Sequence, residues 1–440
     1  MRIPSWLEAD PSLHPEAVYI EADRFCHQKI LLAIGRRTIH TALRLISIYS
    51  RWWRAETCAV FLSSRQLRLS RCEGGVVNLS VKEFPLTLCG YIQCRRVLLC
   101  VWLTAAVASS QTLQQGELAH SATGHEEVLV VQEGLNQVIV LRKDAVGHQT
   151  VIKVGEKPHE VAISKDGRTA YISNFGLLEA DHKVGTPGTT ISVIDVVQKR
   201  ERARFILPAG VRTPHGLKIR PGHPNELFTN AEDGREEMVV FNTDNGTVLR
   251  TFALLEGVHN FIFSDDGADC YAFTTTGSVV RLNPDDGHIL VQTALPKVRG
   301  LALTTDHTHL LAGGWGQLLL LNPKDLTVTR TYANLSVGQI FYPSASPDGR
   351  SFFLPAVLDG VLLVVDALTG DVRNRIVTGS PLQVVFDGND AWISNVKIPT
   401  SMLPAGASER PGGLVHLDLF SYQFRQIEGT EDANGIAIIR

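Results

Sequence analysis

Cysteine is scarce in most of this sequence. Six of the seven cysteines precede residue 101, and Cys270 alone follows them. A lone cysteine excludes an intrachain disulfide within that later region. Because Cys270 adjoins Tyr271 in an expected strand, a buried thiol explains it better than a catalytic nucleophile does.

The sequence also lacks a large excess of positive or negative charge, and it lacks the common catalytic motifs. The formal net charge is −3, and the basic residues form no stripe with interleaved aromatics, which argues against a nucleic-acid partner. The sequence contains no Gly-rich phosphate loop, no CxxCH haem attachment, no HExxH and no GxSxG. The enzyme classes that these motifs define are therefore not supported.

What the sequence does contain is a recurring short apolar run that closes on Asp, Asn or Arg. It occurs seven times after residue 130. The four middle gaps are near 40 to 47 residues, and the first and last gaps are near 52. Such a recurrence predicts a modular array, and four-stranded modules of about 40 to 45 residues are β-propeller blades. The runs end at Arg142, Asp195, Asn242, Asn283, Asn322, Asp366 and Asp418.

The clearest unit lies between residues 158 and 207. Its pattern predicts strands at 159–164, 169–173, 190–195 and 203–207, with a tight Lys-Asp-Gly-Arg turn at 165–168. Hairpins follow one another without helical periodicity. The sequence therefore predicts an all-β fold, a seven-bladed β-propeller of four-stranded antiparallel blades.

The two ends of the array predict how the ring closes. The first unit, from about residue 128 to 155, has only three expected strands, while residues 433–439 resemble a missing first strand. We expect the C-terminal strand to complete the first blade, which leaves no bare inner edge.

Four phrases in the clearest unit resemble a known repeat. They are PHEVAIS at 158–164, DGR at 166–168, YISN at 171–174 and VID at 193–195. Together they resemble the YVTN-type β-propeller repeat of secreted or cell-surface bacterial and archaeal proteins, of the YncE and surface-layer kind. The resemblance covers roughly residues 120 to 440, and it weakens in blades four to six, where the YVTN phrase becomes CYAFTT, LLAGGW and FFLPAV.

The resemblance implies a fold more clearly than a function. Similar propellers include binding proteins, lactonases and the heavy subunits of quinoprotein amine dehydrogenases. Function must therefore be sought in particular residues of this chain.

The region before the propeller, which we place at 119–440, carries a targeting signal. Residues 95–110 place two arginines before a short apolar run and Ala-Val-Ala, the layout of a secretory signal with a small-residue cleavage site. We expect export to the periplasm, cell surface or extracellular space, with membrane contact only through this segment. Residues 1–94 form an atypical leader, best explained by a mis-assigned start; a small amphipathic helical domain or a cytoplasmic leader before a membrane anchor are the alternatives.

The first residues of the inner strands are expected to ring one mouth of the central channel. Three of them are histidines in adjacent blades, and converging imidazoles suit Zn or Cu, or general acid–base chemistry. Alternatively, each histidine fills the mouth and bonds the backbone of a neighbouring blade. The metal-ligand candidates are His159, His215 and His259, and the other mouth candidates are Glu160, Asn260, Arg299 and Asn434.

Two long insertions are expected on the same face. Residues 175–189 and 396–413 join the second and third strands of blades two and seven, and loops of such length are functional or mobile. Asp181 and His182 of the first could reach over the channel, while Arg410 and prolines stiffen the second.

These features favour an exported scaffold that binds a small molecule or a partner protein at this face. One alternative is a small-molecule hydrolase or lyase, lactonase-like or metal-dependent, that uses the channel histidines. A second is the propeller subunit of a quinoprotein amine dehydrogenase-like complex, which would need a partner subunit for the redox cofactor.

Overall fold

The computed structural model describes residues 126–143, 149–178, 181–403 and 405–439, and six short strands before residue 94. The chain divides into two compact units, residues 1–118 and 119–440. The signal-like segment 95–110 lies outside the described residues. Among the residues described, no helix is long and apolar enough to cross a bilayer.

The described residues of the first unit are strands of one antiparallel sheet, in the order β2-β1-β5-β4-β3-β6. Most of the stretch that suggested a helical leader, residues 30–53, lies outside the described residues. The strands are β1 (Tyr19–Ala22), β2 (Ile30–Leu31), β3 (Thr57–Ser63), β4 (Gln66–Arg71), β5 (Val76–Ser80) and β6 (Leu88–Gln93).

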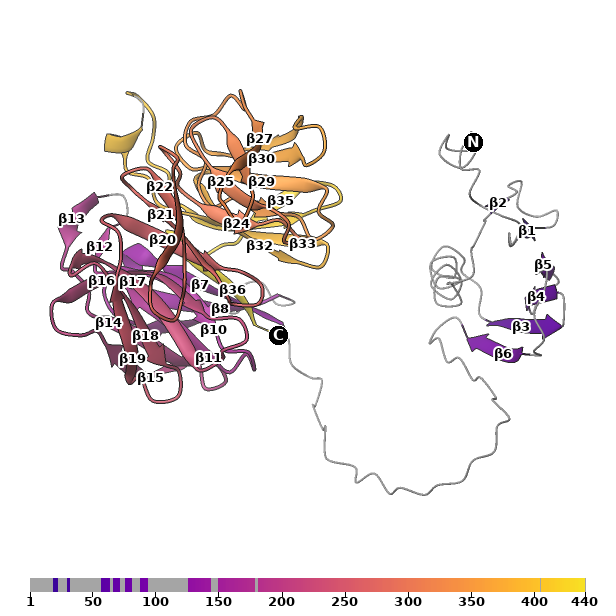
Figure 1. Cartoon of the computed structure of the whole chain (residues 1–440), viewed down its shortest axis with the longest axis horizontal. Helices are drawn as coiled ribbons and strands as arrows, with labels where there is room; N and C mark the ends of the chain where they lie inside the picture. Colours follow the sequence, from indigo (N-terminus) through magenta and orange to yellow (C-terminus); the bar gives the residue numbers. More distant parts are fainter. Residues whose placement is uncertain are drawn as a thin grey trace, which may run out of the picture. The chain divides into compact units, whose positions relative to one another are not determined.

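The second unit consists of seven four-stranded antiparallel sheets, the blades of a seven-bladed β-propeller (Figure 1). This confirms the predicted fold class.

In each blade described below, the strands are given from the innermost to the outermost. Blade one comprises β36 (Ala433–Ile439), β7 (Glu127–Gln132), β8 (Gln137–Arg142) and β9 (Gln149–Lys153). Blade two comprises β10 (Pro158–Ile163), β11 (Thr169–Asn174), β14 (Thr190–Asp195) and β15 (Arg200–Ile206). Blade three comprises β16 (Val211–Ile219), β17 (Glu226–Gly234), β18 (Glu237–Asn242) and β19 (Val248–Ala253). Blade four comprises β20 (Val258–Phe263), β21 (Cys270–Thr274), β22 (Ser278–Leu282) and β23 (Ile289–Ala294).

The remaining three blades follow the same order. Blade five comprises β24 (Leu301–Leu303), β25 (Leu310–Gly313), β26 (Leu318–Leu321) and β27 (Val328–Tyr332). Blade six comprises β28 (Ser344–Ala345), β29 (Ser351–Ala356), β30 (Val361–Asp366) and β31 (Val372–Ile376). Blade seven comprises β32 (Pro381–Asp387), β33 (Asp390–Asn395), β34 (Gly413–Asp418) and β35 (Phe424–Gln426). Outside the blades, the described part of this unit adds the hairpin β12 (Leu177–Leu178) and β13 (Asp181–Gly185), and two 3-10 turns, Glu133–Leu135 and Thr400–Met402.

The C-terminal strand closes the ring, as the sequence predicts. Strand β36 pairs antiparallel with β7, from Ala433 opposite Gln132 to Ile439 opposite Glu127, and the two labels lie side by side in Figure 1. Neighbouring inner strands also contact one another from β36 to β10, β16 and β20. No inner edge is left open at the junction of the two chain ends.

Apolar side chains fill the spaces between blades. Ile191 and Val193 of β14 pack with Val239 and Phe241 of β18, and all four are at most 1% exposed. Burial of each such side chain contributes about 1.5 to 3 kcal/mol, so the interfaces between blades stabilise the ring.

Five of the seven inner strands carry a β-bulge, which begins at the first residue of four of them and at the fourth residue of β16. In β10, both His159 and Glu160 lie between the paired residues Pro158 and Val161. A bulge breaks the strict alternation of a strand and redirects side chains, so two successive polar residues are buried together here. The corresponding shifts lie at Pro214/Leu217, Val258/Asn260, Pro381/Val384 and Ala433/Ile436.

Candidate metal centre at the channel mouth

The three predicted histidines come together at the bulges of β10, β16 and β20. The rings of His159 and His215 have centroids 4.1 Å apart, and those of His215 and His259 are 4.2 Å apart. All three side chains are buried. The three imidazoles therefore form a continuous row across three adjacent blades.

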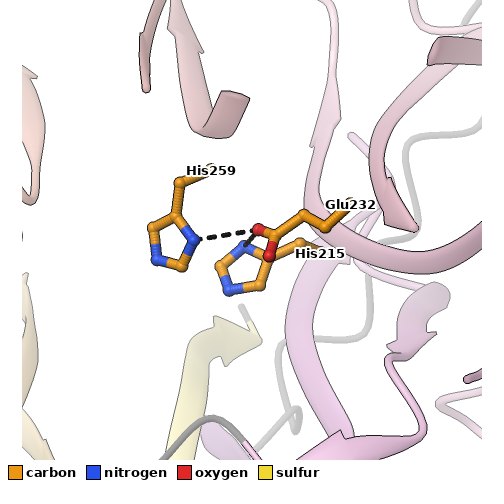
Figure 2. Close-up of side chains that lie close together, drawn as sticks. All are labelled: His215, Glu232 and His259. Carbon is orange, nitrogen blue, oxygen red and sulfur yellow. Dashed lines mark ion pairs between the residues drawn. The ribbon is translucent and has the colours of Figure 1, made fainter. Parts of the chain in front are cut away.

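A carboxylate that the sequence analysis missed joins this row. Glu232 Oε1 lies 2.9 Å from His259 Nδ1 and 3.7 Å from His215 Nδ1. Figure 2 shows both Nδ1 atoms turned toward the carboxylate and both Nε2 atoms turned away from it. The cluster thus combines two nitrogen donors and one oxygen donor.

Glu232 reaches the mouth because strand β17 is longer than expected. It continues past Asn230, the expected end of the second strand, and pairs with β16 as far as Gly234. The Glu232 amide donates to Thr213 Oγ1 at 3.2 Å, which fixes its backbone against blade three's inner strand. One sequence feature could have indicated Glu232. It lies two residues after Asn230, and residues two apart in a strand share one side of it.

The geometry of His215, Glu232 and His259 suits a metal ion. One donor atom from each residue lies within 4.8 Å of the other two. Tetrahedral donors with bonds of about 2.1 Å are separated by roughly 3.4 Å, so small side-chain rotations would complete the site. Two imidazoles and a carboxylate are a donor set found with Zn²⁺ and with other first-row metals. His159 stacks on His215 and is not one of these three donors.

Two phenylalanines border the histidine row. Phe175 lies edge-on to His159 and His215, with centroid distances of 5.6 and 5.2 Å. Phe273 lies at 5.6 Å from His259 in the same manner. These rings exclude water from one side of the cluster, which strengthens electrostatic interactions there.

The first insertion places Phe175 over the histidines. Gly188 is required there, because a Cβ at this position would lie 1.8 Å from the Asn174 carbonyl oxygen. The ring of His182, in β13, lies 5.3 Å from that of Phe175, and His182 itself is exposed. The insertion thus brings His182 beside Phe175, while the Asp181 side chain lies outside the described residues; the expected reach over the channel stays a prediction.

Below the histidines, Glu160 forms a polar layer across the channel. Its carboxylate accepts hydrogen bonds from Lys218 Nζ at 2.6 Å, Asn260 Nδ2 at 2.7 Å and Gln383 Nε2 at 3.4 Å. Burial raises the pKa of Glu160, but the charges of Lys218 and of the nearby His159 outweigh it and hold that pKa below its usual value. Because these groups satisfy one another, this layer ties four blades together.

The two predicted arginines make structural contacts. Arg410 Nη1 donates to the carbonyl oxygens of Val357 and Gly379 at 3.0 and 3.2 Å, which fastens the second insertion to blade six. Arg299, which is half-buried, donates to the carbonyl oxygen of its neighbour Val298 at 3.3 Å.

Asn434 occupies the mouth position of blade one. The register shift in β36 places it where His159 lies in β10. Its side chain is fully buried, and neither amide atom has a hydrogen-bond partner among the described residues. A buried amide that stays unpaired costs about 1 to 3 kcal/mol, so a bonding partner at the channel mouth would stabilise this position.

Comparisons with known proteins give no functional assignment. No family model matches the chain, and no curated protein matches it. Among solved structures, the chain is similar to Kuenenia stuttgartiensis hydrazine synthase, with 16% sequence identity and a TM-score of 0.49, over 61% of this chain and 88% of that chain. A likeness at this level of identity says nothing about activity or ligand. The resemblance to the YVTN-type repeat stays a prediction.

Proposed function

We propose that this β-propeller binds a divalent transition-metal ion, Zn²⁺ in the first place, at its channel mouth through His215, Glu232 and His259. The observation that carries the proposal is the cluster itself, two imidazoles and one carboxylate with donor atoms within 4.8 Å of one another. Neutral imidazole and carboxylate are ligands that Zn²⁺ accepts in catalytic sites with three protein donors.

A bound metal ion would explain how the expected scaffold binds a ligand. A site with three protein donors leaves a fourth position for a small ligand or a water molecule. The scaffold would then select ligands by their ability to coordinate the metal, and the metal-dependent hydrolase alternative remains compatible with it.

A second candidate rests on the 2.9 Å contact between His259 Nδ1 and Glu232 Oε1. A carboxylate that fixes one nitrogen of an imidazole orients the other as a general base. In this case the site acts without a metal, and the Nε2 atom of His259 accepts a proton from a bound substrate or water molecule.

Metal titration separates these candidates. The full chain, stripped of metal, is titrated with Zn²⁺ by calorimetry and with Co²⁺ by visible absorption. We expect one ion per chain, and an affinity lower by about 10- to 100-fold in both variants. His215→Ala removes a nitrogen donor, and Glu232→Gln replaces a charged oxygen donor with a neutral amide oxygen.

The matched control is His416→Ala. His416 also contacts a carboxylate, Asp390, at 3.0 Å, but it lies on β34 of blade seven. Its replacement should leave the metal affinity unchanged. Absence of stoichiometric metal in the unaltered chain would sink the proposal and leave the Glu232–His259 pair as the better candidate.

A further inference from the structure

A second hollow lies on blade five, independent of the metal centre. It measures about 370 Å³ and is lined by Trp315, Gln317, Asn334 and Ser336 among others. Trp315 is 56% exposed, whereas Trp392, the other tryptophan in the described residues, is buried at 3%. Trp315 lies in the turn between β25 and β26, and such turns open on the same face as the histidine row.

The backbone around the hollow is held in an uncommon shape. Asn334 and Ser336 have φ values of 60° and 55°, in the left-handed region that costs a non-glycine residue energy. The Gly316 amide donates to the Gly338 carbonyl oxygen at 2.7 Å, and the Gly338 amide donates to Asp359 Oδ2 at 2.9 Å. These contacts fix the backbone of the hollow in one shape.

The hydrogen-bonding groups of the hollow are available to a ligand. The side chains of Gln317, Asn334 and Ser336 make no hydrogen bond to any described residue. An amide offers two donors and one acceptor group, and a hydroxyl offers both functions. Such groups beside a half-exposed indole suit a ligand that combines many hydroxyls with an apolar C–H surface, which is the chemistry of a sugar ring.

Two cations border the hollow. Lys297 Nζ lies 5.0 Å from the centroid of the Trp315 ring. Arg375 donates from its guanidinium to the carbonyl oxygens of Leu335 and Ser336 at 3.2 and 3.1 Å. No acidic residue is among the described residues that line the hollow. The nearby carboxylate of Asp359 accepts a hydrogen bond from the Gly338 amide and keeps its negative charge. Because two cations stand against this one anion, the local charge still favours an anionic ligand.

We propose that this hollow binds a saccharide that bears a carboxylate, such as a uronic acid. A sugar ring packs against the exposed part of the Trp315 indole beside Lys297, its hydroxyls bond the amides of Gln317 and Asn334, and its carboxylate pairs with Lys297. A hollow of about 370 Å³ falls in the usual range for small-ligand sites, about 300 to 1,000 Å³.

Calorimetric titration of the full chain with trigalacturonate tests the proposal, with the methyl-esterified trisaccharide as the uncharged control. We expect binding of the acid, at least 10-fold weaker binding of the ester, and a loss of at least 10-fold in Trp315→Ala and in Asn334→Ala. Phe420→Ala is the matched variant, since Phe420 is an exposed aromatic on blade seven (93% exposed) and its removal should change nothing.

The titration decides whether the hollow binds the saccharide, and its result does not depend on the metal centre. No binding of the acid, or equal binding by Trp315→Ala, overturns the site. Equal affinity for acid and ester overturns the role of the carboxylate. The affinity should be the same in His215→Ala, so failure of the metal proposal would leave this result unaffected.

Discussion

The two halves of the channel mouth are built on one backbone frame and differ in chemistry. In blades one to three, equivalent bulge positions carry Asn434, His159 and His215. In blade seven, the same position carries Leu382, which is 4% exposed. Leu382 packs in an apolar cluster with Val357, Val396, Ile398 and Leu403, and with Phe341 and Tyr342 at its edge.

The insertions that cover the two halves differ in the same sense. The insertion of blade two brings Phe175 onto the imidazoles. The insertion of blade seven brings Ile398 and Leu403 onto Leu382 and is fastened by Arg410. One half is thus a row of polar side chains, most of them imidazoles, and the other is an apolar cluster. The comparison indicates that chemistry on this fold depends on single mouth positions and not on the blades that support them.

The largest expected effect comes from the hydrophobic half. Leu382→Ala should lower the free energy of unfolding by about 2 to 5 kcal/mol, because it removes buried methyl groups and leaves a cavity. The affinity for Zn²⁺ should not change, since the three donors lie in blades three and four. Urea unfolding and Zn²⁺ calorimetry on the same preparation measure both quantities. A fall in Zn²⁺ affinity as large as that of His215→Ala would show that the two halves are not independent.

A smaller, pH-dependent effect is expected beneath the polar half. The pKa of Glu160 lies below the ordinary 4.5 in the folded protein, so its carboxylate stabilises the fold above that ordinary value. The contribution is lost as the pH falls through the lower, folded-state pKa. Glu160→Gln should therefore cost about 1 to 3 kcal/mol at pH 7, and the difference from the unaltered chain should shrink below about pH 4.5.

Urea midpoints at pH 7, 5, 4 and 3 measure this difference. The control is Glu409→Gln, because Glu409 is half exposed and pairs with Lys397 at the surface; an exposed pair contributes about 0 to 1 kcal/mol. A gap between Glu160→Gln and the unaltered chain that stays constant from pH 7 to 3 would contradict the assigned ionisation.

The frame of the mouth could be predicted from the sequence, because local patterns define it. Repeat length indicated seven blades, and the three-stranded first unit required the C-terminal strand to close the ring. The histidines could be aligned because each stands at the start of an inner strand in successive repeats. Their rings lie 4.1 to 4.2 Å from the next in the row.

The donors that complete each layer could not be predicted in the same way. Glu232 comes from a second strand that runs beyond its expected end at Asn230. Lys218 lies in β16 just after the bulge that begins at Pro214, and from there its side chain reaches Glu160. Such contacts depend on bulges and on the packing of one blade against the next, which repeat spacing does not encode.

The smallest effect is expected from a substitution that gives a position of the polar half the residue type of the apolar half. Asn434→Leu places in blade one the residue that blade seven has at the equivalent position, Leu382. Because the buried Asn434 amide has no hydrogen-bond partner among the described residues, its replacement by an apolar group of similar size should raise the free energy of unfolding, by about 1 kcal/mol.

Asn395→Leu is the matched control for this change. Asn395 is also a buried amide, 2% exposed, but its Oδ1 accepts a hydrogen bond from the Ser380 amide at 2.8 Å. Its replacement should destabilise the protein, since it leaves that amide without its partner. Urea midpoints that move in opposite directions would show that Asn434 is retained at a cost to stability, as expected of a group that faces a ligand. Equal destabilisation by both variants would mean that Asn434 is a structural residue, and that the polar half begins at His159.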